Sequence, residues 1–271
     1  YLASTSNDEL LKIWEGLGYY SRALNMHKTA LIVQEKFDGK FPSKYSDLIE
    51  LPGIGDYTAS AVSSICSDEV QPVVDGNVLR FLSRLYKIDL PIDTAKTKTY
   101  FKNLGFKLIK GVKPGDFNQA MMDYGSMVCK PRKSGCHDCM FSTECEAFNT
   151  DSVMQYPFKK KKIKIKDRYL NYVVVISDDK KTRIKKRDNE GIWKNLYEFP
   201  LIETKKESTC NDIIKKLDID FLELKDVKKI KHKLSHQLLH ISFFIFRVGD
   251  VFDDFISIQS LNKYPFPKPL N

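Results

Sequence analysis

The architecture of this chain follows from one short segment, which reads Leu51-Pro52-Gly53-Ile54-Gly55-Asp56-Tyr57-Thr58-Ala59. The segment lies between two helical patterns, and its two glycines can adopt positive φ angles and turn a hairpin tightly. Such a turn leaves backbone amides and a helix N-terminus pointing outward, an arrangement that can bind a phosphate. A plain connection between two helices, with no ligand, is the alternative interpretation.

Helical patterns surround this hairpin. We expect a helix capped by Ser6 or Asn7, a second over Ala23–Phe37, a third after Asp56 and a fourth after Asp75. The residues of the last two helices that are expected to face the core are Ala59, Val62, Ile65, Val78, Phe81, Leu82 and Leu85. The first half of the chain is therefore predicted to be helical.

The composition changes near residue 150. Residues 159–168 hold seven basic residues against one acid, which indicates a solvated linker or a strap that follows phosphates. After it, strands are predicted at Tyr169–Ser177, Thr182–Lys186 and His240–Val248, with an amphipathic helix at Asn211–Leu217. We therefore expect a helical domain over residues 1–150, a basic linker over 151–168 and a smaller α+β domain over 169–271.

Length and charge narrow the class of protein. The chain has 271 residues, of which 42% are hydrophobic, so it can bury a core and fits two domains better than one. No apolar run approaches the roughly 18 residues of a membrane span, which predicts a soluble protein with no membrane partner. The chain opens with Tyr1 and lacks a signal-peptide pattern, so we expect a fragment. A net charge of +9 favours a nucleic acid partner, although a generic basic protein has the same composition.

Four of the six cysteines form the pattern Cys129-x6-Cys136-x2-Cys139-x5-Cys145. Four thiolates at such spacings can close around one metal centre. A disulfide framework in a small secreted domain would spread its cysteines more evenly. The spacing alone fits a structural zinc ion and an iron–sulfur cluster equally well.

Asp75 directly precedes a predicted helix. At this position we expect the carboxylate to cap the helix by accepting hydrogen bonds from backbone amides. An ionised carboxylate held there could also stabilise a developing positive charge, and the two roles are compatible.

The segment Gly16-Leu17-Gly18-Tyr19-Tyr20-Ser21-Arg22 has two interpretations. It can turn the chain and bury two aromatic rings, which the sequence alone favours. It can also place one ring in the base stack of a distorted duplex, as apolar wedges do in proteins that bend DNA.

Together these motifs resemble the helix-hairpin-helix DNA glycosylases with an iron–sulfur loop, and most closely the adenine DNA glycosylase (MutY) family. The other matching segments are Phe117–Asp123, Gly191–Pro200, Leu234–His236 and Tyr264–Pro267. The resemblance implies a mainly α helix-hairpin-helix glycosylase domain followed by a smaller α+β Nudix-like domain that recognises 8-oxoguanine. It also implies a monomeric, bacterial, cytoplasmic enzyme that acts on double-stranded DNA containing adenine opposite 8-oxoguanine or guanine.

The resemblance carries functional roles onto individual residues. The cysteine quartet would hold a four-iron four-sulfur (4Fe-4S) cluster, with zinc as the alternative. Asp75 would stabilise the oxocarbenium-like sugar as adenine leaves, with Asn77 and Tyr57 assisting. The residues implied to contact DNA are Gly53 and Gly55 (a phosphate), Gln119 (the flipped adenine), Tyr19 with Leu17 (the wedge), and Ser235 with His236 (8-oxoguanine).

The chain departs from the family pattern in two places. The family's catalytic acid is a glutamate that lies upstream of the region matching Tyr1, so this chain is expected to be inactive as it stands or to act as a non-catalytic DNA-binding fragment. A phenylalanine of the family is replaced by Leu234, which keeps bulk but loses an aromatic face.

Tyr57 separates this chain from glycosylases that also cut the strand. Relatives such as endonuclease III carry a lysine at this position that forms a Schiff base, which a tyrosine cannot form. We therefore predict monofunctional base removal, with an endonuclease III-like lyase as the alternative. A Nudix hydrolase would need a cluster of glutamates for its metal, and the residues after Gly191 lack it, so the second domain is predicted to bind without hydrolysing.

Overall fold

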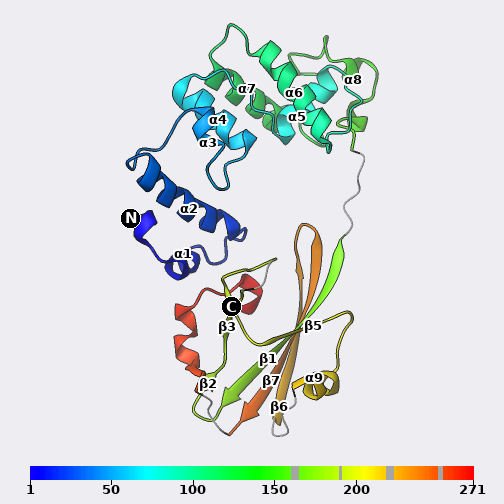
Figure 1. The fold of residues 1–271 in the computed structure, drawn as a ribbon. Helices are drawn as coiled ribbons and strands as arrows, with labels where there is room; N and C mark the ends of the chain where they lie inside the picture. The colour runs from blue at the N-terminus through cyan, green and yellow to red at the C-terminus, as the bar shows by residue number, and fades with distance from the viewer. Residues whose placement is uncertain (160–164, 189–190, 218–222, 250–252) are drawn as a thin grey trace. The chain divides into compact units, whose positions relative to one another are not determined.

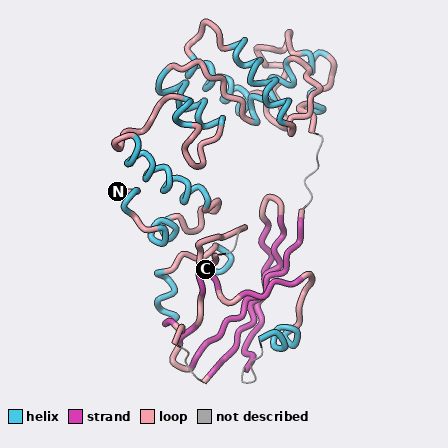
Figure 2. The backbone as a smooth tube through the Cα atoms, viewed as in Figure 1, coloured by secondary structure: helices cyan, strands magenta, loops and turns pink. Residues whose placement is uncertain are grey.

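The computed structural model describes residues 1–159, 165–188, 191–217, 223–249 and 253–271. Contacts between residues divide the chain into two compact units. The helical unit comprises Lys28–Lys162, and the sheet unit comprises Ile163–Asn271 together with Tyr1–His27 (Figure 1, Figure 2). Among the described helices, none is both long enough and apolar enough to cross a bilayer.

The helical unit is built around one central helix, α5 (Gly76–Leu85). Its other elements are the end of α2 (Ser21–Lys36), α3 (Tyr45–Leu48), α4 (Asp56–Ser67), α6 (Ala95–Leu108), α7 (Pro114–Met127), α8 (Glu146–Asn149) and the 3-10 turn η2 (Val153–Gln155). The apolar face predicted for α5 is buried, and it packs against Phe101 of α6. The helices predicted after Asp56 and Asp75 are confirmed, and both start within one residue of the position read from the sequence.

Helix α4 buries a different face from the predicted one. Ala59 is fully buried, but Ile65, which we expected to face the core, is 51% exposed. The buried polar side chains of this helix are Ser60, Ser63 and Ser64. Gly115 of α7 lies so close that a Cβ there would be 3.0 Å from the Ser64 carbonyl oxygen. The prediction for Ile65 was wrong because small side chains, not large apolar ones, let α7 approach α4.

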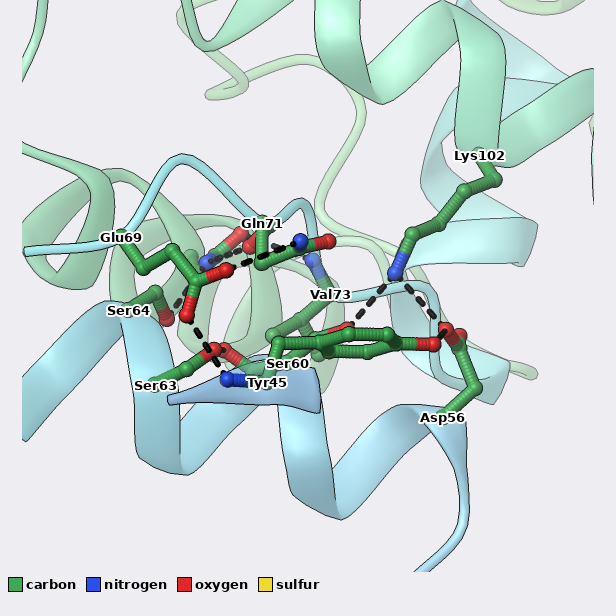
Figure 3. Close-up of polar contacts among 10 residues, drawn as sticks. Tyr45, Asp56, Ser60, Ser63, Ser64, Glu69, Gln71, Val73 and Lys102 are labelled. Atoms are coloured by element: carbon green, nitrogen blue, oxygen red, sulfur yellow. Dashed lines mark hydrogen bonds and ion pairs between the residues drawn. The ribbon is translucent and has the colours of Figure 1, made fainter. Parts of the chain in front are cut away.

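Polar contacts hold the connection between α3 and α4 in place (Figure 3). Lys102 Nζ of α6 donates to Asp56 Oδ1 at 2.9 Å and to Ser60 Oγ at 2.6 Å. The Tyr45 hydroxyl of α3 donates to the same Asp56 oxygen at 2.8 Å. Burial, followed by this carboxylate, raises the pKa of Tyr45 to about 12. The hairpin between α3 and α4 is therefore anchored where it enters α4.

The sheet unit contains one large sheet with strand order β6-β7-β1-β2-β8, in which β5 also pairs with β1. Strand β1 runs parallel to β7, and the other pairings are antiparallel. The strands are β1 (Lys166–Ser177), β2 (Lys181–Thr182), β5 (Leu201–Thr204), β6 (Glu223–Lys233), β7 (Gln237–Val248) and β8 (Ile256–Ser257). The remaining elements are the β3–β4 pair (Lys185–Lys186 and Tyr197–Glu198), α9 (Cys210–Leu217), η3 (Ile258–Lys263) and η4 (Lys268–Leu270).

The strands predicted at Tyr169–Ser177 and His240–Val248 and the helix at Asn211–Leu217 are present. The strand predicted at Thr182–Lys186 was wrong as one element, because it is divided into β2 and β3, which pair in different sheets. Two further differences concern β1 and β6. Strand β1 begins at Lys166, so the end of the expected linker is strand, while the lysines at 160–162 and 164 lie outside the described residues. Strand β6 was not predicted, because it is an exposed edge strand whose lysines occupy both faces and hide the two-residue alternation.

The segments of the second half that carried the family resemblance share one core. Leu170, Tyr172, Leu239 and Ile241 form its buried sheet face with Phe266. The partly buried side chains that pack on this face include Ile192, Trp193, Tyr197, Phe199, Leu234 and Tyr264. Leu234 therefore fills a position at the edge of this core, where its bulk is used although it has no ring.

A buried ion pair lies beside this core. Glu198 Oε2 accepts from Arg187 Nη1 at 2.6 Å and from the Tyr172 hydroxyl at 3.2 Å. The three residues are each at most 5% exposed. Burial and the Glu198 charge raise the pKa of Tyr172. In the described part of the chain, Arg187 Nε has no hydrogen-bond partner, so the guanidinium depends on Glu198 for its neutralisation.

The first helix, α1 (Asn7–Ile13), follows the 3-10 turn η1 (Leu2–Ser4) and packs within the sheet unit. Ser6 caps it in a capping box with Glu9, as predicted. Its buried residues Leu10 and Leu11 share a cluster with Leu196. Other contacts of the segment that contains α1 are Asp8 with Lys186 and with the Tyr197 hydroxyl, and Glu15 Oε1 accepting from the Phe266 amide.

Candidate functional site

Asp75 sits at the N-terminus of α5 with both carboxylate oxygens engaged. Oδ1 accepts from the amides of Asn77 at 2.9 Å and Val78 at 2.7 Å, which confirms the predicted cap. Oδ2 accepts from Asn77 Nδ2 at 2.9 Å. These bonds fix the carboxylate in one orientation.

Arg80 connects this carboxylate to the cysteine loop. Its Nη2 donates to Asn77 Oδ1 at 2.9 Å, so the Asn77 amide can only present its nitrogen to Asp75. Its Nε donates to the Cys129 carbonyl oxygen at 2.7 Å. Burial, with Arg84 nearby, lowers the pKa of Arg80. A continuous chain of hydrogen bonds therefore runs from Asp75 through Asn77 and Arg80 to the first cysteine of the quartet.

Gly125 lets α7 pack closely against the first turn of α5 at Asn77. A Cβ at Gly125 would lie 2.7 Å from the Asn77 carbonyl oxygen and 2.8 Å from its Cβ. The Gly125 carbonyl oxygen also accepts from Arg80 Nη2. Glycine is required here because α7 crosses directly against the first turn of α5.

The hairpin before α4 has one left-handed glycine rather than two. Gly53 has φ +81°, but Gly55 has φ −96° and serves as the N-cap of α4. A Cβ at Gly55 would meet open space. Within the described residues, the structure records no acceptor for the amides of Gly53 and Gly55. Amides without an acceptor beside a helix start can bind an anion, so a phosphate at this hairpin stays a prediction.

The other predicted adenine-contacting residues lie on neighbouring elements. The Tyr57 hydroxyl donates to Met122 Sδ of α7 at 3.7 Å, and Tyr57 is 48% exposed. Gln119 is exposed on α7, and its Nε2 donates to Asp123 Oδ1 at 2.9 Å. The structure thus joins Asp75 and Asn77 directly, and it leaves Tyr57 and Gln119 accessible without a hydrogen bond to either.

All four quartet cysteines line one pocket. Arg84 Nη1 donates to Cys129 Sγ at 3.4 Å, and the Tyr124 hydroxyl lies 3.0 Å from Cys139 Sγ. Burial, followed by the neighbouring thiols, raises the pKa of Cys136. No three His, Cys, Asp or Glu side chains in the described ranges converge closely enough to bind a single ion. The quartet therefore surrounds a space instead of meeting at a point.

The predicted wedge and the predicted 8-oxoguanine-reading residues meet in the sheet unit. Tyr20 is buried at 8% exposure, whereas Tyr19 is 66% exposed with φ +47°. The Tyr19 hydroxyl lies 3.5 Å from Ser235 Oγ. Ser235 and His236 form the exposed tip of the β6–β7 hairpin, which is closed by the Leu234 amide donating to the Gln237 carbonyl oxygen at 2.8 Å. Leu17 is also exposed, although no contact joins it to this tip among the described residues.

Comparison with known proteins identifies the family. Residues 1–105 match the HhH-GPD superfamily of base excision DNA repair proteins, and residues 171–271 match the NUDIX domain. The chain is 39% identical over 238 residues to the adenine DNA glycosylase of Buchnera aphidicola subsp. Schizaphis graminum, covering 86% of this chain and 67% of that protein. The chain belongs to the adenine DNA glycosylase family.

Other members of the adenine DNA glycosylase family agree. The enzyme of Buchnera aphidicola subsp. Acyrthosiphon pisum is 36% identical over 245 residues, covering 89% of this chain and 68% of that protein. A solved thermostable thymine-DNA glycosylase aligns with a TM-score of 0.50 and 27% identity, over 55% of this chain and 69% of that one. The predicted fold class, a helix-hairpin-helix domain followed by a Nudix-like domain, is confirmed, and the chain is a base excision repair glycosylase.

Two buried arginines of this family member were missed by sequence reasoning. Arg80 and Arg84 lie on the side of α5 opposite the predicted apolar face, yet both are buried, and Arg84 is only 2% exposed. Arg84 donates to the carbonyl oxygens of Lys130 and Tyr156. Their spacing of four residues places both on the polar side of an amphipathic helix, which sequence patterning assigns to solvent, so no signal in the sequence indicated that they are buried.

Proposed function

We propose that this enzyme removes adenine paired with 8-oxoguanine or guanine, by hydrolysing the bond between adenine and the sugar without cutting the strand. The observation that carries the proposal is the fixed carboxylate of Asp75, in a unit that also contains a hairpin whose glycine amides have no acceptor recorded among the described residues. In this reaction the sugar gains positive charge as adenine departs, and water then bonds to the sugar carbon. A rigid anion beside that carbon lowers the barrier because it requires no reorganisation.

Each side chain has a separate role in this proposal. Asn77 holds Asp75 in place, Gly53 and Gly55 bind a phosphate of the adenine strand, and Gln119 contacts the flipped adenine. Tyr57 lines the site and supports a monofunctional reaction, because a phenol cannot form the Schiff base on which strand cutting depends. The proton for adenine comes from a glutamate, as the family resemblance implies. Flipping is cheaper at a mispair, so the partner base decides which adenine is removed.

The second recognition element is the hairpin tip in the sheet unit. We propose that Ser235 and His236 contact 8-oxoguanine while Tyr19, with Leu17, enters the base stack. The 3.5 Å approach of Tyr19 to Ser235 supports this grouping. The proposal uses the domain limits read from the sequence, 1–150 and 169–271 with a linker over 151–168, and a monomeric enzyme that meets DNA in the bacterial cytoplasm.

Changing Ser235 and His236 together to alanine tests this function. The preference for adenine opposite 8-oxoguanine over adenine opposite guanine should fall by about tenfold or more, because a base contact is worth about 1–3 kcal/mol. Affinity for the guanine-containing duplex should hardly change, since phosphate contacts remain. Paired fluorescence anisotropy titrations at one salt concentration measure both. An equal loss on both duplexes, or no loss on either, would remove these residues from the recognition site.

We further propose that Cys129, Cys136, Cys139 and Cys145 hold a 4Fe-4S cluster with a structural role beside the DNA surface. Four thiols spread around one pocket fit a cluster whose irons each take one thiolate better than they fit a single zinc ion. Polar groups of Arg84 and Tyr124 also contact two of the sulfurs, Cys129 Sγ and Cys139 Sγ.

The cluster proposal predicts a brown protein that contains iron. Cys136→Ser should lose the iron and the visible absorption and should lower the melting temperature, because metal-ligand energy is partly folding energy. Cys66→Ser is the matched control, since Cys66 is exposed and outside the pocket. Iron analysis and absorption spectra measure the effect in both variants, and only Cys136→Ser should lose iron and visible absorption. Stoichiometric zinc without iron in the parent protein would contradict the proposal.

A further inference from the structure

Among the described residues, α9 covers one end of one face of the large sheet. Ile213 of α9 packs on Val173, Phe244 and Phe246 at that end. Towards the β6–β7 tip, the strands continue beyond α9 (Figure 1). Because side chains alternate along a strand, the register places Lys229, Lys231 and Lys233 on the same face as Phe244.

These three lysines form a straight row on the edge strand. Their cross-strand partners on β7 are Ser242, His240 and Leu238. Alternate residues of a strand lie about 6.8 Å apart, so the row spans about 14 Å. That length equals the axial rise of about four successive phosphates of one DNA strand. The row is therefore long enough to contact several phosphates at once.

The charge of this row is mostly unopposed. All three lysines are exposed. Lys229 pairs with Glu207 at 2.8 Å, but both side chains are more than half exposed, so the pair is readily exchanged. In the described ranges no ion pair is recorded for Lys231 or Lys233. A row of cations at an accessible edge attracts a polyanion.

The floor beside the row is polar and rigid. The Tyr169 ring stacks on His240 at 4.6 Å between centroids, with 14° between the planes. His240 Nε2 lies 2.7 Å from Asp167 Oδ1, which fixes the imidazole from the other side. Such a floor offers no apolar groove for a peptide, whereas a hydrated phosphate backbone can lie along it.

We propose that the lysine face, defined as Lys229, Lys231 and Lys233, binds the phosphate backbone of duplex DNA next to the damaged base. The row ends two residues before Ser235, so a strand lying along it leads directly to the hairpin tip. The proposal rests on the proposed function of that tip and adds the surface that supplies sequence-independent affinity. Phosphate contacts of this kind fix the position of a duplex, while the tip distinguishes the base.

The test is the salt dependence of binding by a triple variant, Lys229→Gln, Lys231→Gln and Lys233→Gln. Each lost phosphate contact lowers the slope of log affinity against log salt by about 0.9, so we expect a reduction of about 2.7. The dissociation constant should rise by roughly tenfold or more at moderate salt, equally for duplexes with 8-oxoguanine and with guanine. Glu207→Gln should have the opposite effect and lower the dissociation constant at low salt, because it frees Lys229 from its ion pair.

The matched control removes the same charge from the same unit. Lys215 and Lys216 lie on α9, and Lys228 lies on β6 opposite Phe243, on the other face. Changing these three to glutamine should leave the slope nearly unchanged. An unchanged slope in the first triple variant, or an equal fall in the control, would overturn the proposal. This failure would leave the proposed function intact if changing Ser235 and His236 to alanine still lowers the preference for 8-oxoguanine. The proposed function would be refuted if that alanine variant keeps the full preference.

Discussion

Asp75→Asn should lower adenine excision by at least about 100-fold while leaving duplex affinity nearly unchanged, because the negative charge acts only on the transition state. The amide oxygen can still cap α5, since asparagine is as good an N-cap as aspartate. In the variant, the NH2 group that replaces Asp75 Oδ2 faces Asn77 Nδ2, which is also a donor. The Asn77 amide cannot rotate to present its oxygen instead, because that oxygen accepts from Arg80. We therefore expect the loss of one hydrogen bond but an intact helix.

The measurement separates chemistry from binding. Excision is followed under single-turnover conditions in a chain extended by the glutamate-bearing segment that the family places upstream, and anisotropy gives the affinity. Asp212→Asn is the control. Asp212 lies in the first turn of α9, so this substitution also removes one negative charge from the start of a helix. Normal turnover in Asp75→Asn would show that this carboxylate is only a cap.

Glu198→Ala should lower the free energy of unfolding of the sheet unit by about 3–5 kcal/mol. The reason is that removal of one partner leaves the Arg187 guanidinium buried without a counter-charge and takes the acceptor from Tyr172. The double variant Arg187→Met with Glu198→Leu should be less destabilised than Glu198→Ala, since it removes both charges and keeps volume. Chemical denaturation followed by a probe in the sheet unit measures both.

An exposed pair provides the comparison. Asp178 and Arg247 form an ion pair in which each side chain is about half exposed, so Asp178→Ala should have little effect. A small effect for Glu198→Ala, similar to that of Asp178→Ala, would mean that water reaches Arg187. It would contradict the assignment of this pair as a buried structural element.

Local signals were read correctly from the sequence, and long-range ones were not. The caps at Ser6 and Asp75 are confirmed because a cap depends on residues within one turn of itself. The buried serines of α4 could not be predicted, because their burial depends on Gly115, which lies about fifty residues later in the chain. The same holds for Arg80, whose partner carbonyl belongs to Cys129.

In the candidate site, too, local motifs could be predicted from the sequence and long-range contacts could not. The motif around Asp75 and the cysteine spacing pointed to the two chemical centres, but not to the hydrogen bonds that join them. In the second half, runs of β-branched and aromatic residues predicted β1 and β7, while β6 was hidden because nearly all of its side chains are exposed. Periodicity detects a strand only where one of its faces is buried.

The packing of α1 on the sheet unit imposes an order on biosynthesis. The Asp8 carboxylate and the Tyr197 hydroxyl that contacts it are 189 residues apart in the chain. A ribosome that adds about 5–20 residues per second needs roughly 10–40 s to supply that partner. During this interval Leu10 and Leu11 can pack only on near neighbours such as Tyr20 and Ala23, because Leu196 of the same cluster has not yet been made. Helix α1 is therefore expected to depend on a chaperone until the residues around Tyr197 have been made.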